Sequence, residues 1–435
     1  MTTAVSPRAI LSNRSVVWGA FLLVHVYLCW VNIACPQGSM NDPTMVYKQW
    51  VDQSLIGSGH RVGIDIAWVY PALAFIPMVL TRFFSDALIG QSWLVMVTAL
   101  DAIVMYALTR RSSLRSSSAI PVGRCMACWW WLVFLVLLGP ISLARLDAIS
   151  AALGILGLLW AVRRPVVAGV ITAIAMWIKV WPVGLVIVMF VTLRRTRSLV
   201  LSAVSIVSSG VILVCLSLGS GLKVFGFLTQ QTGRGIQLES PFALIWLGQR
   251  ILGVPGISVD YSLEQLTYEI NGPGADTVVA MSTLALVLGI IAVTIIASWA
   301  VARGAGFTAV APPFALGMVT VLMLGNKVGS PQFVSWLSVP IVFGLVLWRL
   351  EFHIPALITL EIALVTQLIY PTWYDQLISV APFMVILLAL KTAGIVALFV
   401  WSVRALLRVE RTQIRRTAVA VGGTVPESAA LSRAG

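Results

Sequence analysis

Long apolar segments recur along the whole of this chain, and they constrain its fold more than any other feature. Of the 435 residues, 59% are hydrophobic and only 10% are charged, which leaves too little polar surface for a water-soluble protein of this size. Apolar runs of about 18 residues or more are long enough to cross a bilayer as helices. Because lipid offers backbone groups no hydrogen-bond partner, the chain is expected to form an all-α integral membrane bundle.

The basic residues gather in short clusters at the ends of the apolar segments. Clusters occur within residues 110–124, 163–164, 194–197 and 404–416. Cytoplasmic loops of membrane proteins are enriched in Lys and Arg, and such clusters also attract anionic lipid. Topology and anionic membrane lipid therefore explain the net charge of +13, and nucleic acid is not expected as a partner.

The order of these clusters predicts about twelve transmembrane helices, with both termini in the cytoplasm and the protein in the plasma membrane. Residues 1–15 would form a cytoplasmic tail, and residues 16–405 the transmembrane domain. Residues 406–435 would form a basic cytoplasmic tail, which begins as a basic helix and is partly disordered because its end is small and polar.

One apolar segment does not fit this series of spans. Residues 68–81 are too short to cross and contain Pro71 and Pro77, so they are expected to lie in the outer interface as an amphipathic helix. With this assignment, residues 34–90 form a first extracytoplasmic loop and residues 219–275 form a second.

In this topology the unusual polar motifs all fall on the outer face. The first loop holds the acids Asp42, Asp52 and Asp65 together with His60, in a chain that has few charges. The other outer motifs are ARLD at 144–147, KVWP at 179–182, TGRGIQLES at 232–240, NKVGSPQ at 326–332 and YPTWYD at 370–375. One face of the membrane is therefore expected to carry the chemistry.

Three of these motifs, taken in order, resemble those of GT-C type membrane glycosyltransferases. The spacing of Asp42 and Tyr47, followed by W-x-Y-P at 68–71, resembles the first lumenal loop of enzymes that use polyprenyl-phosphate sugars. R-L-D at 145–147 followed by K-V-W-P resembles the paired motif of glycosyltransferase family 87, the actinobacterial polyprenyl-phosphate-mannose-dependent α-mannosyltransferases. NKVGSPQF with Trp336 is similar to a motif of that family and of the catalytic subunit of GPI mannosyltransferase I. The chain departs from the family where Ala72, and not a second proline, follows the tyrosine and proline.

The resemblance implies an inverting transfer of mannose from polyprenyl-phosphate mannose to a lipid-anchored glycan on the extracytoplasmic face. Phosphatidylinositol mannosides, lipomannan and lipoarabinomannan are the implied acceptors. Such a reaction needs a carboxylate to accept the proton of the acceptor hydroxyl and cations to stabilise the leaving phosphate.

Three other functions stay open. The donor sugar could instead be arabinose, since related scaffolds use polyprenyl-phosphate arabinose. A flippase or transporter of lipid-linked sugars would be expected to have charges at the membrane midplane and repeat symmetry. A non-catalytic subunit of an envelope assembly would not depend on any single outer acid.

Asp42 is the first candidate for the general base, because a short tether after the first span fixes it near the membrane surface. The alternative is that Asp42 caps a helix beginning at Pro43. Asp65 is the second candidate, as a base or as an acceptor-binding residue, although capping explains it equally well. Asp52 is expected on a solvated helix face.

Candidate ligands of the donor phosphate are the basic residues of the outer motifs, Arg145, Lys179, Lys327 and Arg234. The alternatives are an ion pair between Arg145 and Asp147, and lysines that extend their amines from helix ends to the interface. Pro182 is expected to end or kink the helix just beyond Lys179 and so to open a cavity.

Further candidates for contacts with substrate are Tyr47, His60, Tyr70, Asp147, Gln332 and Trp336. Within the spans, His25 is expected to serve helix packing, while Asp101 and Lys391 would either pair with neighbouring helices or serve a site. The sequence has no HxxxH or DxD motif and no carboxylate cluster with metal spacing. It therefore predicts no cofactor, and a divalent cation on the donor phosphate has no support.

Overall fold

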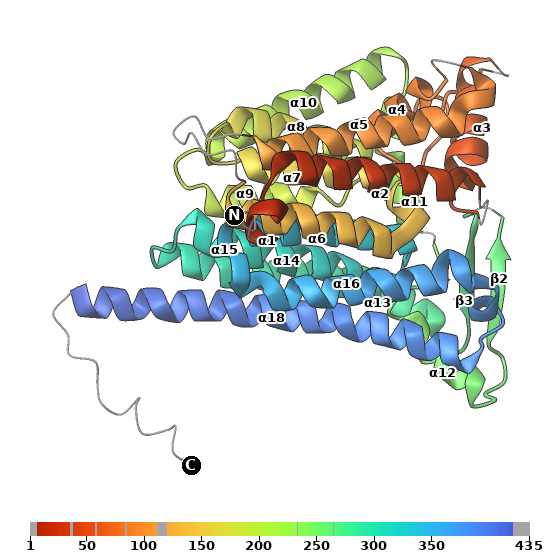
Figure 1. The fold of residues 1–435 in the computed structure, drawn as a ribbon. Helices are drawn as coiled ribbons and strands as arrows, with labels where there is room; N and C mark the ends of the chain where they lie inside the picture. Colours follow the sequence, from red (N-terminus) through yellow and green to blue (C-terminus); the bar gives the residue numbers. More distant parts are fainter. Residues whose placement is uncertain are drawn as a thin grey trace, which may run out of the picture.

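Long helices run side by side in this protein, and a small sheet and several short helices lie at one end of the bundle (Figure 1). The computed structural model describes residues 7–34, 38–56, 59–82, 85–110, 120–232, 234–263 and 265–420. The long helices are α2 (Arg14–Ala34), α5 (Ile89–Thr109), α6 (Val122–Leu138), α7 (Leu146–Trp160), α8 (Pro165–Ile178), α9 (Val183–Thr192), α10 (Arg197–Ser217), α13 (Ala275–Ala302), α14 (Phe307–Leu324), α15 (Val334–Trp348), α16 (His353–Gln367) and α18 (Pro382–Ala420).

The described part of the chain contains eight segments that are long and apolar enough to cross a membrane, and α7, α8 and α9 are shorter apolar helices. The prediction of an α-helical membrane protein is confirmed at this level. The number of twelve spans stays a prediction, because the three shorter helices fall below the length of a full span. One of the eight segments, Pro331–Thr372, contains both α15 and α16.

Two helices, α10 and α13, leave much of their apolar surface uncovered. Ile206 and Leu213 on α10 are 72% and 65% exposed, and Leu284 and Leu288 on α13 are 58% and 55% exposed. Helices α14 and α15 are instead buried along nearly their whole length. Because apolar surface of this extent is unfavourable in water, α10 and α13 are the helices that lipid would cover.

Small residues allow the helices to approach closely at the contact between α8 and α10. A Cβ atom added to Gly169 would lie 2.8 Å from the carbonyl oxygen of Val200 and 2.9 Å from the Cβ atom of Ala203. Without a strong hydrophobic driving force between helices in lipid, close backbone packing of this kind is a main source of helix association.

The described part of residues 34–90, which we refer to as the first outer loop after its predicted position, is less helical than the sequence predicts. It contains a π-helical turn η1 (Asp42–Tyr47), α3 (Lys48–Leu55) and α4 (Phe75–Leu80). The expected helix over residues 68–81 is wrong in its first part, because Pro71 has an extended backbone and helical structure starts only at Ala72. Trp68 is buried and does not face an interface.

The second outer loop contains a small sheet that the sequence does not predict. It comprises α11 (Gly226–Thr232), β1 (Ile236–Gln237), α12 (Ala243–Ile251), β2 (Ser258–Ser262) and β3 (Thr267–Asn271). The strands are antiparallel in the order β1-β3-β2, with Ile236 opposite Ile270 and Tyr261 opposite Tyr268.

Both outer loops lie at the same end of the bundle, and the first helix α1 (Pro7–Leu11) and the end of α18 lie at the other end (Figure 1). The two loops thus share one end of the bundle, and the prediction that this end is extracytoplasmic stays a prediction. Helix α18 continues to Ala420, as expected for a tail that begins as a basic helix, and residues 421–435, in the segment expected to be disordered, lie outside the described residues.

We predict that Gly169→Val lowers the free energy of unfolding by about 1–3 kcal/mol, the usual cost of overpacking a tight contact. The matched control is Gly210→Val on α10, where an added Cβ atom has nothing within 4 Å. Thermal unfolding of the purified protein in detergent measures both variants. Equal losses of stability in the two variants would contradict the close contact between α8 and α10.

Candidate active site

Three segments that are far apart in the sequence meet at the carboxylate of Asp147. Its Oδ2 atom lies 3.1 Å from Nζ of Lys179, and its Oδ1 atom accepts a 2.7 Å hydrogen bond from Nε1 of Trp336. Asp147 is 1% exposed, so both contacts form away from solvent. The R-L-D motif, the K-V-W-P motif and the segment ending at Trp336 therefore form one cluster.

The ends of α7 and α8 explain this placement. Asp147 lies in the first turn of α7, where unpaired amides and the helix dipole favour a carboxylate. Helix α8 ends at Ile178, Lys179 has an extended backbone (φ −147°, ψ 135°), and α9 begins only after Pro182. A break in the helix near Pro182 is confirmed, but it lies earlier than predicted: α8 ends at Ile178, before Lys179, and Pro182 is the residue that precedes α9.

Asp42 forms a second ion pair with Arg145, beside the first. Oδ2 of Asp42 lies 3.0 Å from Nε of Arg145, whose side chain is 8% exposed while that of Asp42 is 29% exposed. The guanidinium also donates to the carbonyl oxygens of Ser39 and Ala144 and to the hydroxyl of Tyr370.

Two alternatives raised by the sequence are wrong. Arg145 pairs with Asp42 and not with Asp147, because Asp147 is engaged by Lys179 and Trp336. Asp42 is the first residue of η1 and makes no side-chain capping bond, since Asn41 occupies the capping position. The proposed role of Arg145 in binding a donor phosphate is not favoured either, because its guanidinium is already engaged by four groups of the protein.

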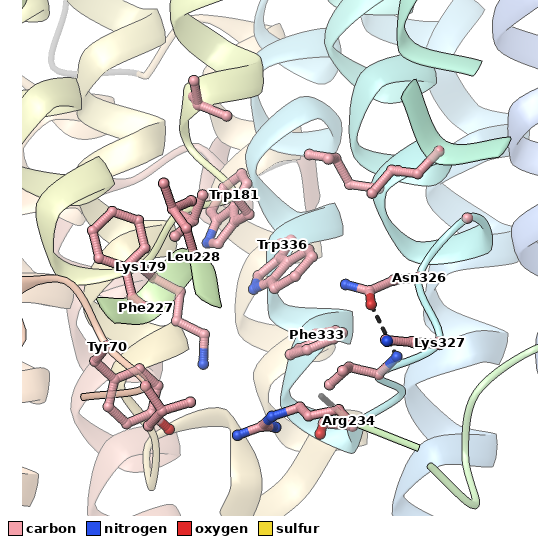
Figure 2. A pocket seen from close by; sticks show the side chains of 18 of the residues that line it. Tyr70, Lys179, Trp181, Phe227, Leu228, Arg234, Asn326, Lys327, Phe333 and Trp336 are labelled. Atoms are coloured by element: carbon pink, nitrogen blue, oxygen red, sulfur yellow. Dashed lines mark hydrogen bonds between the residues drawn. The ribbon is translucent and has the colours of Figure 1, made fainter. Parts of the chain in front are cut away.

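A cavity of about 400 Å³ lies next to these pairs (Figure 2). Its described lining contains three cationic side chains, Lys179, Arg234 and Lys327, and no carboxylate. Aromatic and aliphatic side chains make up much of the rest of the lining, which also includes the uncharged polar residues Ser282, Thr283, Asn326, Ser330 and Gln332; the apolar residues include Tyr70, Trp181, Phe227, Leu228, Leu286, Leu322, Phe333 and Trp336. Figure 2 shows the amine of Lys179 and the guanidinium of Arg234 directed into the same space. The cavity thus combines positive charge with apolar surface.

The surroundings keep Lys179 charged. Burial lowers the pKa of its ammonium, but the charge of Asp147, together with Tyr70 and the charge of Asp42, outweighs burial and leaves the pKa raised. The ammonium also lies 4.7 Å from the ring centroid of Tyr70. Because a raised pKa favours the protonated amine, Lys179 stays positive at neutral pH and above.

For Arg234 and Lys327, the other two cations of the cavity, nearby negative groups do not fully offset the effect of burial on the pKa. Burial lowers the pKa of Arg234, and Tyr70 and Glu269 offset it only in part. Burial also lowers the pKa of Lys327, and the positive charge of Arg234 lowers it further against the opposing effect of Glu269. An anion bound between the two side chains would relieve both effects.

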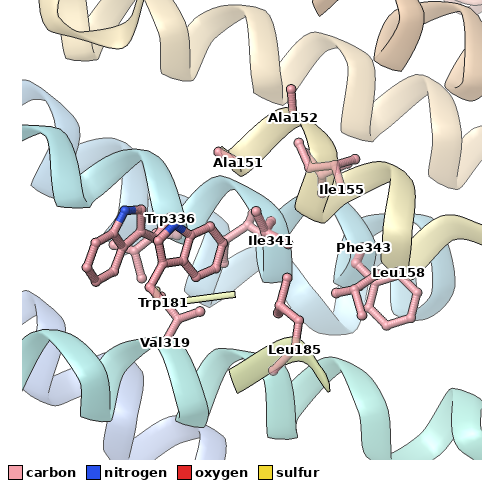
Figure 3. Packing of buried hydrophobic residues seen from close by; sticks show 14 of the residues in the cluster. Ala151, Ala152, Ile155, Leu158, Trp181, Leu185, Val319, Trp336, Ile341 and Phe343 are labelled. Carbon is pink, nitrogen blue, oxygen red and sulfur yellow. The ribbon is translucent and has the colours of Figure 1, made fainter. Parts of the chain in front are cut away.

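An aromatic pair closes the cavity toward the centre of the bundle (Figure 3). The rings of Trp181 and Trp336 stack with centroids 5.3 Å apart, and Phe333 stacks on Trp336 at 4.1 Å. Nε1 of Trp181 donates to Ser150 of α7 at 2.9 Å. Aliphatic side chains such as Leu185 lie next to the pair (Figure 3), so the buried hydrophobic core supports this wall of the cavity.

The tyrosines and Gln332 were predicted to contact substrate, and they have different surroundings. Tyr70 and Gln332 line the cavity. Tyr47 is 2% exposed and packs against Tyr70 and Trp93, and its hydroxyl has no hydrogen-bond partner among the described residues. Tyr70 therefore connects the cavity to the first loop, whereas Tyr47 lies behind it.

Asp65, His60 and Asp52 do not line the cavity. Asp65 is held by Arg61 through its backbone amide and its guanidinium, and these bonds lower the pKa of Asp65 to about 2. His60 is exposed. Asp52 pairs with Lys48 and Arg82, so it belongs to an ion network and not to an unpaired solvated face.

Asp101 and Lys391, the two charged span residues noted in the sequence, each have a partner. Oδ2 of Asp101 lies 3.2 Å from Nε2 of His25, which is therefore more than a packing residue. Nζ of Lys391 lies 2.7 Å from Oε2 of Glu239 in the second outer loop. Neither pair lines the cavity. The described residues contain no group of His, Cys, Asp or Glu that could hold a metal ion.

Several residues of the site were not singled out from the sequence. Tyr370 belongs to the YPTWYD motif, and only its position on the outer face could have indicated its contact with Arg145. Trp181 lies within K-V-W-P, which was noted for its lysine and proline. Phe227 and Leu286 carry no sequence signal, because aromatic and aliphatic residues are common throughout this chain.

The chain matches no protein-family model, and no curated protein or solved structure is similar to it. The resemblance to glycosyltransferase family 87 therefore rests on the motifs alone.

We predict that Asp147→Asn destabilises the protein by about 3–5 kcal/mol, because it leaves the buried ammonium of Lys179 without its counter-charge. The matched control is Asp86→Asn, which breaks an exposed pair with Arg82 and should cost about 0–1 kcal/mol. Denaturant unfolding of both variants in micelles measures the difference. An Asp147→Asn variant as stable as Asp86→Asn would contradict the buried pair.

Proposed function

We propose that this protein is an inverting membrane glycosyltransferase. It transfers mannose from polyprenyl-phosphate mannose to a lipid-linked glycan, of the phosphatidylinositol mannoside, lipomannan or lipoarabinomannan type, on the extracytoplasmic face. The observation that carries the proposal is the cationic and apolar cavity with the carboxylate of Asp42 nearby.

The donor has two parts, and the cavity offers surface for each. A phosphodiester needs cations, and Lys179, Arg234 and Lys327 supply charge without a competing carboxylate in the described lining. A polyprenyl chain needs apolar surface, and Leu286 of α13 and Leu322 of α14 contribute it. A soluble sugar nucleotide has no lipid chain that could contact this apolar wall.

The sugar would lie between the cations and the first loop. Tyr70, Phe333 and Trp336 present ring faces and edges of the kind that pack against sugar rings, and Gln332 provides an amide for hydroxyl groups. The negative charge of Asp42 raises the pKa of Lys179, which lines the cavity. This effect supports a position of the Asp42 carboxylate close to the cavity. Arg145 fixes the direction of that carboxylate through the ion pair.

The chemistry follows from this arrangement. The acceptor oxygen bonds to the anomeric carbon as the bond from that carbon to the phosphate oxygen breaks. The proton of the acceptor hydroxyl passes to Asp42, and polyprenyl phosphate leaves with the electron pair of the broken bond. The cations stabilise the charge that develops on the phosphate. Attack from the side opposite the phosphate inverts the anomeric centre.

We predict that Asp42→Asn lowers the rate of sugar transfer by roughly a hundredfold or more, the range expected for loss of a general base. Asp65→Asn should leave transfer nearly unchanged. The pKa of Asp65 is about 2, so its carboxylate is ionised at any assay pH above that value and supplies no limb of the pH–rate profile. The assay uses purified protein in nanodiscs, radiolabelled polyprenyl-phosphate mannose and a mannosylated lipid acceptor.

Other outcomes of this assay point elsewhere. Loss of sugar transfer in Asp65→Asn alone would show that Asp65, and not Asp42, is the general base. Transfer from polyprenyl-phosphate arabinose but not from the mannose donor would change the sugar and keep the mechanism. If the wild type transfers neither sugar, the glycosyltransferase proposal is wrong, and a flippase or an assembly subunit becomes the better description.

We predict that Arg234→Gln raises the KM for the donor about tenfold or more, since a charge-assisted hydrogen bond contributes about 1.5–3 kcal/mol. Its control is Lys223→Gln, which removes an exposed cation of the same loop outside the cavity lining. Initial rates at varied donor concentration measure both. Equal KM values for the two variants would exclude Arg234 as a donor ligand.

A further inference from the structure

Two of the cavity cations lie on segments that are bound to each other. Arg234 precedes strand β1, and Lys327 lies in the loop between α14 and α15. The backbone amide of Gln237 donates to the carbonyl oxygen of Lys327 at 3.0 Å, and the hydroxyl of Ser330 donates to Oε1 of Gln237 at 3.3 Å. Segment 234–240 and loop 326–330 are therefore joined by hydrogen bonds, and we refer to the two together as a layer.

The two segments of this layer are packed in close contact with each other. A Cβ atom added to Gly329 would lie 2.2 Å from the backbone nitrogen of Ser240. The hydroxyl of Ser240 donates to the carbonyl oxygen of Asn326 at 3.2 Å. A shift of segment 234–240 must therefore move loop 326–330 with it, and both cations would change position.

This layer is attached to the bundle by a buried ion pair. Nζ of Lys391, in the outer part of α18, lies 2.7 Å from Oε2 of Glu239, and the two side chains are 5% and 1% exposed. The other carboxylate oxygen of Glu239 is buried without a hydrogen-bond partner among the described residues. Burying two charges is costly and gains little over an apolar pair, so stability alone does not account for this contact.

We propose that Glu239 and Lys391 are positioning residues that hold Arg234 and Lys327 in the geometry needed for a phosphate-headed lipid. Neither residue lines the cavity, so neither contacts the ligand directly. The inference rests on the proposed function, because it takes the cavity to be the site of the donor phosphate. It adds that a helix on the far side of the second loop controls the affinity of that site.

The test measures binding separately from catalysis. Radiolabelled polyprenyl phosphate, which carries no sugar, is titrated against wild-type protein and Lys391→Met in nanodiscs. We expect Lys391→Met to weaken binding by roughly tenfold or more, because small displacements of positioned groups carry costs of this order. With the sugar donor, the KM for the donor should rise while the KM for the acceptor stays the same.

A matched control separates positioning from general destabilisation. Asp101→Asn alters the contact with His25, a buried polar pair within the spans that does not line the cavity. It should lower the melting temperature without changing the affinity for polyprenyl phosphate. The double variant Glu239→Gln/Lys391→Met removes both charges, so it should fold even if Lys391→Met does not, and it should still bind weakly.

Three results would overturn the proposal. Unchanged affinity in a folded Lys391→Met protein or in the double variant would show that the pair does not position the cations. Equal losses of affinity in Lys391→Met and Asp101→Asn would reduce its role to stability. If wild-type protein does not bind polyprenyl phosphate at all, the proposed donor site itself is wrong. Normal binding by the wild type with no effect of Lys391→Met refutes the positioning role alone.

Discussion

The cost of placing a charge among apolar helices is the constraint on which the outer end of this protein depends. Buried or half-buried ion pairs join segments that are distant in the sequence: Asp42 with Arg145, Asp147 with Lys179 and Glu239 with Lys391. Breaking one partner of such a pair leaves an uncompensated charge in a low-dielectric environment. Each pair therefore holds a loop or a helix end in one arrangement. Without these pairs, the irregular segments at this end would not be fixed in position.

The cavity differs from these pairs in the balance of its charge. Lys179 has a carboxylate partner in Asp147, but the described lining adds Arg234 and Lys327 without any acidic group. Cations that converge on a recess with apolar walls generate a strong positive potential, because little water is present to screen them. The same energetic rule that pairs charges elsewhere thus makes this recess a site for an anion.

Hydropathy, basic clusters and prolines were enough to predict much of the bundle. A break in the helix near Pro182 was predicted, although it lies before Lys179 and not beyond it, and the structure brings Asp147, Lys179 and Trp336, all from predicted motifs, together. The choice of partners could not be predicted. Arg145 and Asp147 looked like a natural pair because they are close in sequence, but side chains two residues apart at a helix start do not face each other.

Other features were beyond sequence reasoning for a different reason. The strands of the second loop have two to five residues, too few for a clear alternation of apolar and polar side chains. Glu239 and Lys391 are single charged residues whose proximity depends on the packing of α18 against the loop. Such contacts depend on tertiary structure, and no local pattern indicates them.

Helix α13 separates the cavity from the surrounding lipid by the thickness of one helix. Ser282, Thr283 and Leu286 line the cavity, while Leu284 and Leu288 on the same helix are exposed on the outside of the bundle. A ligand with a lipid tail would therefore be exchanged within the plane of the membrane and not from the aqueous phase. The quantity that determines occupancy would then be the mole fraction of that lipid in the bilayer, and dilution of the surrounding buffer would leave it unchanged.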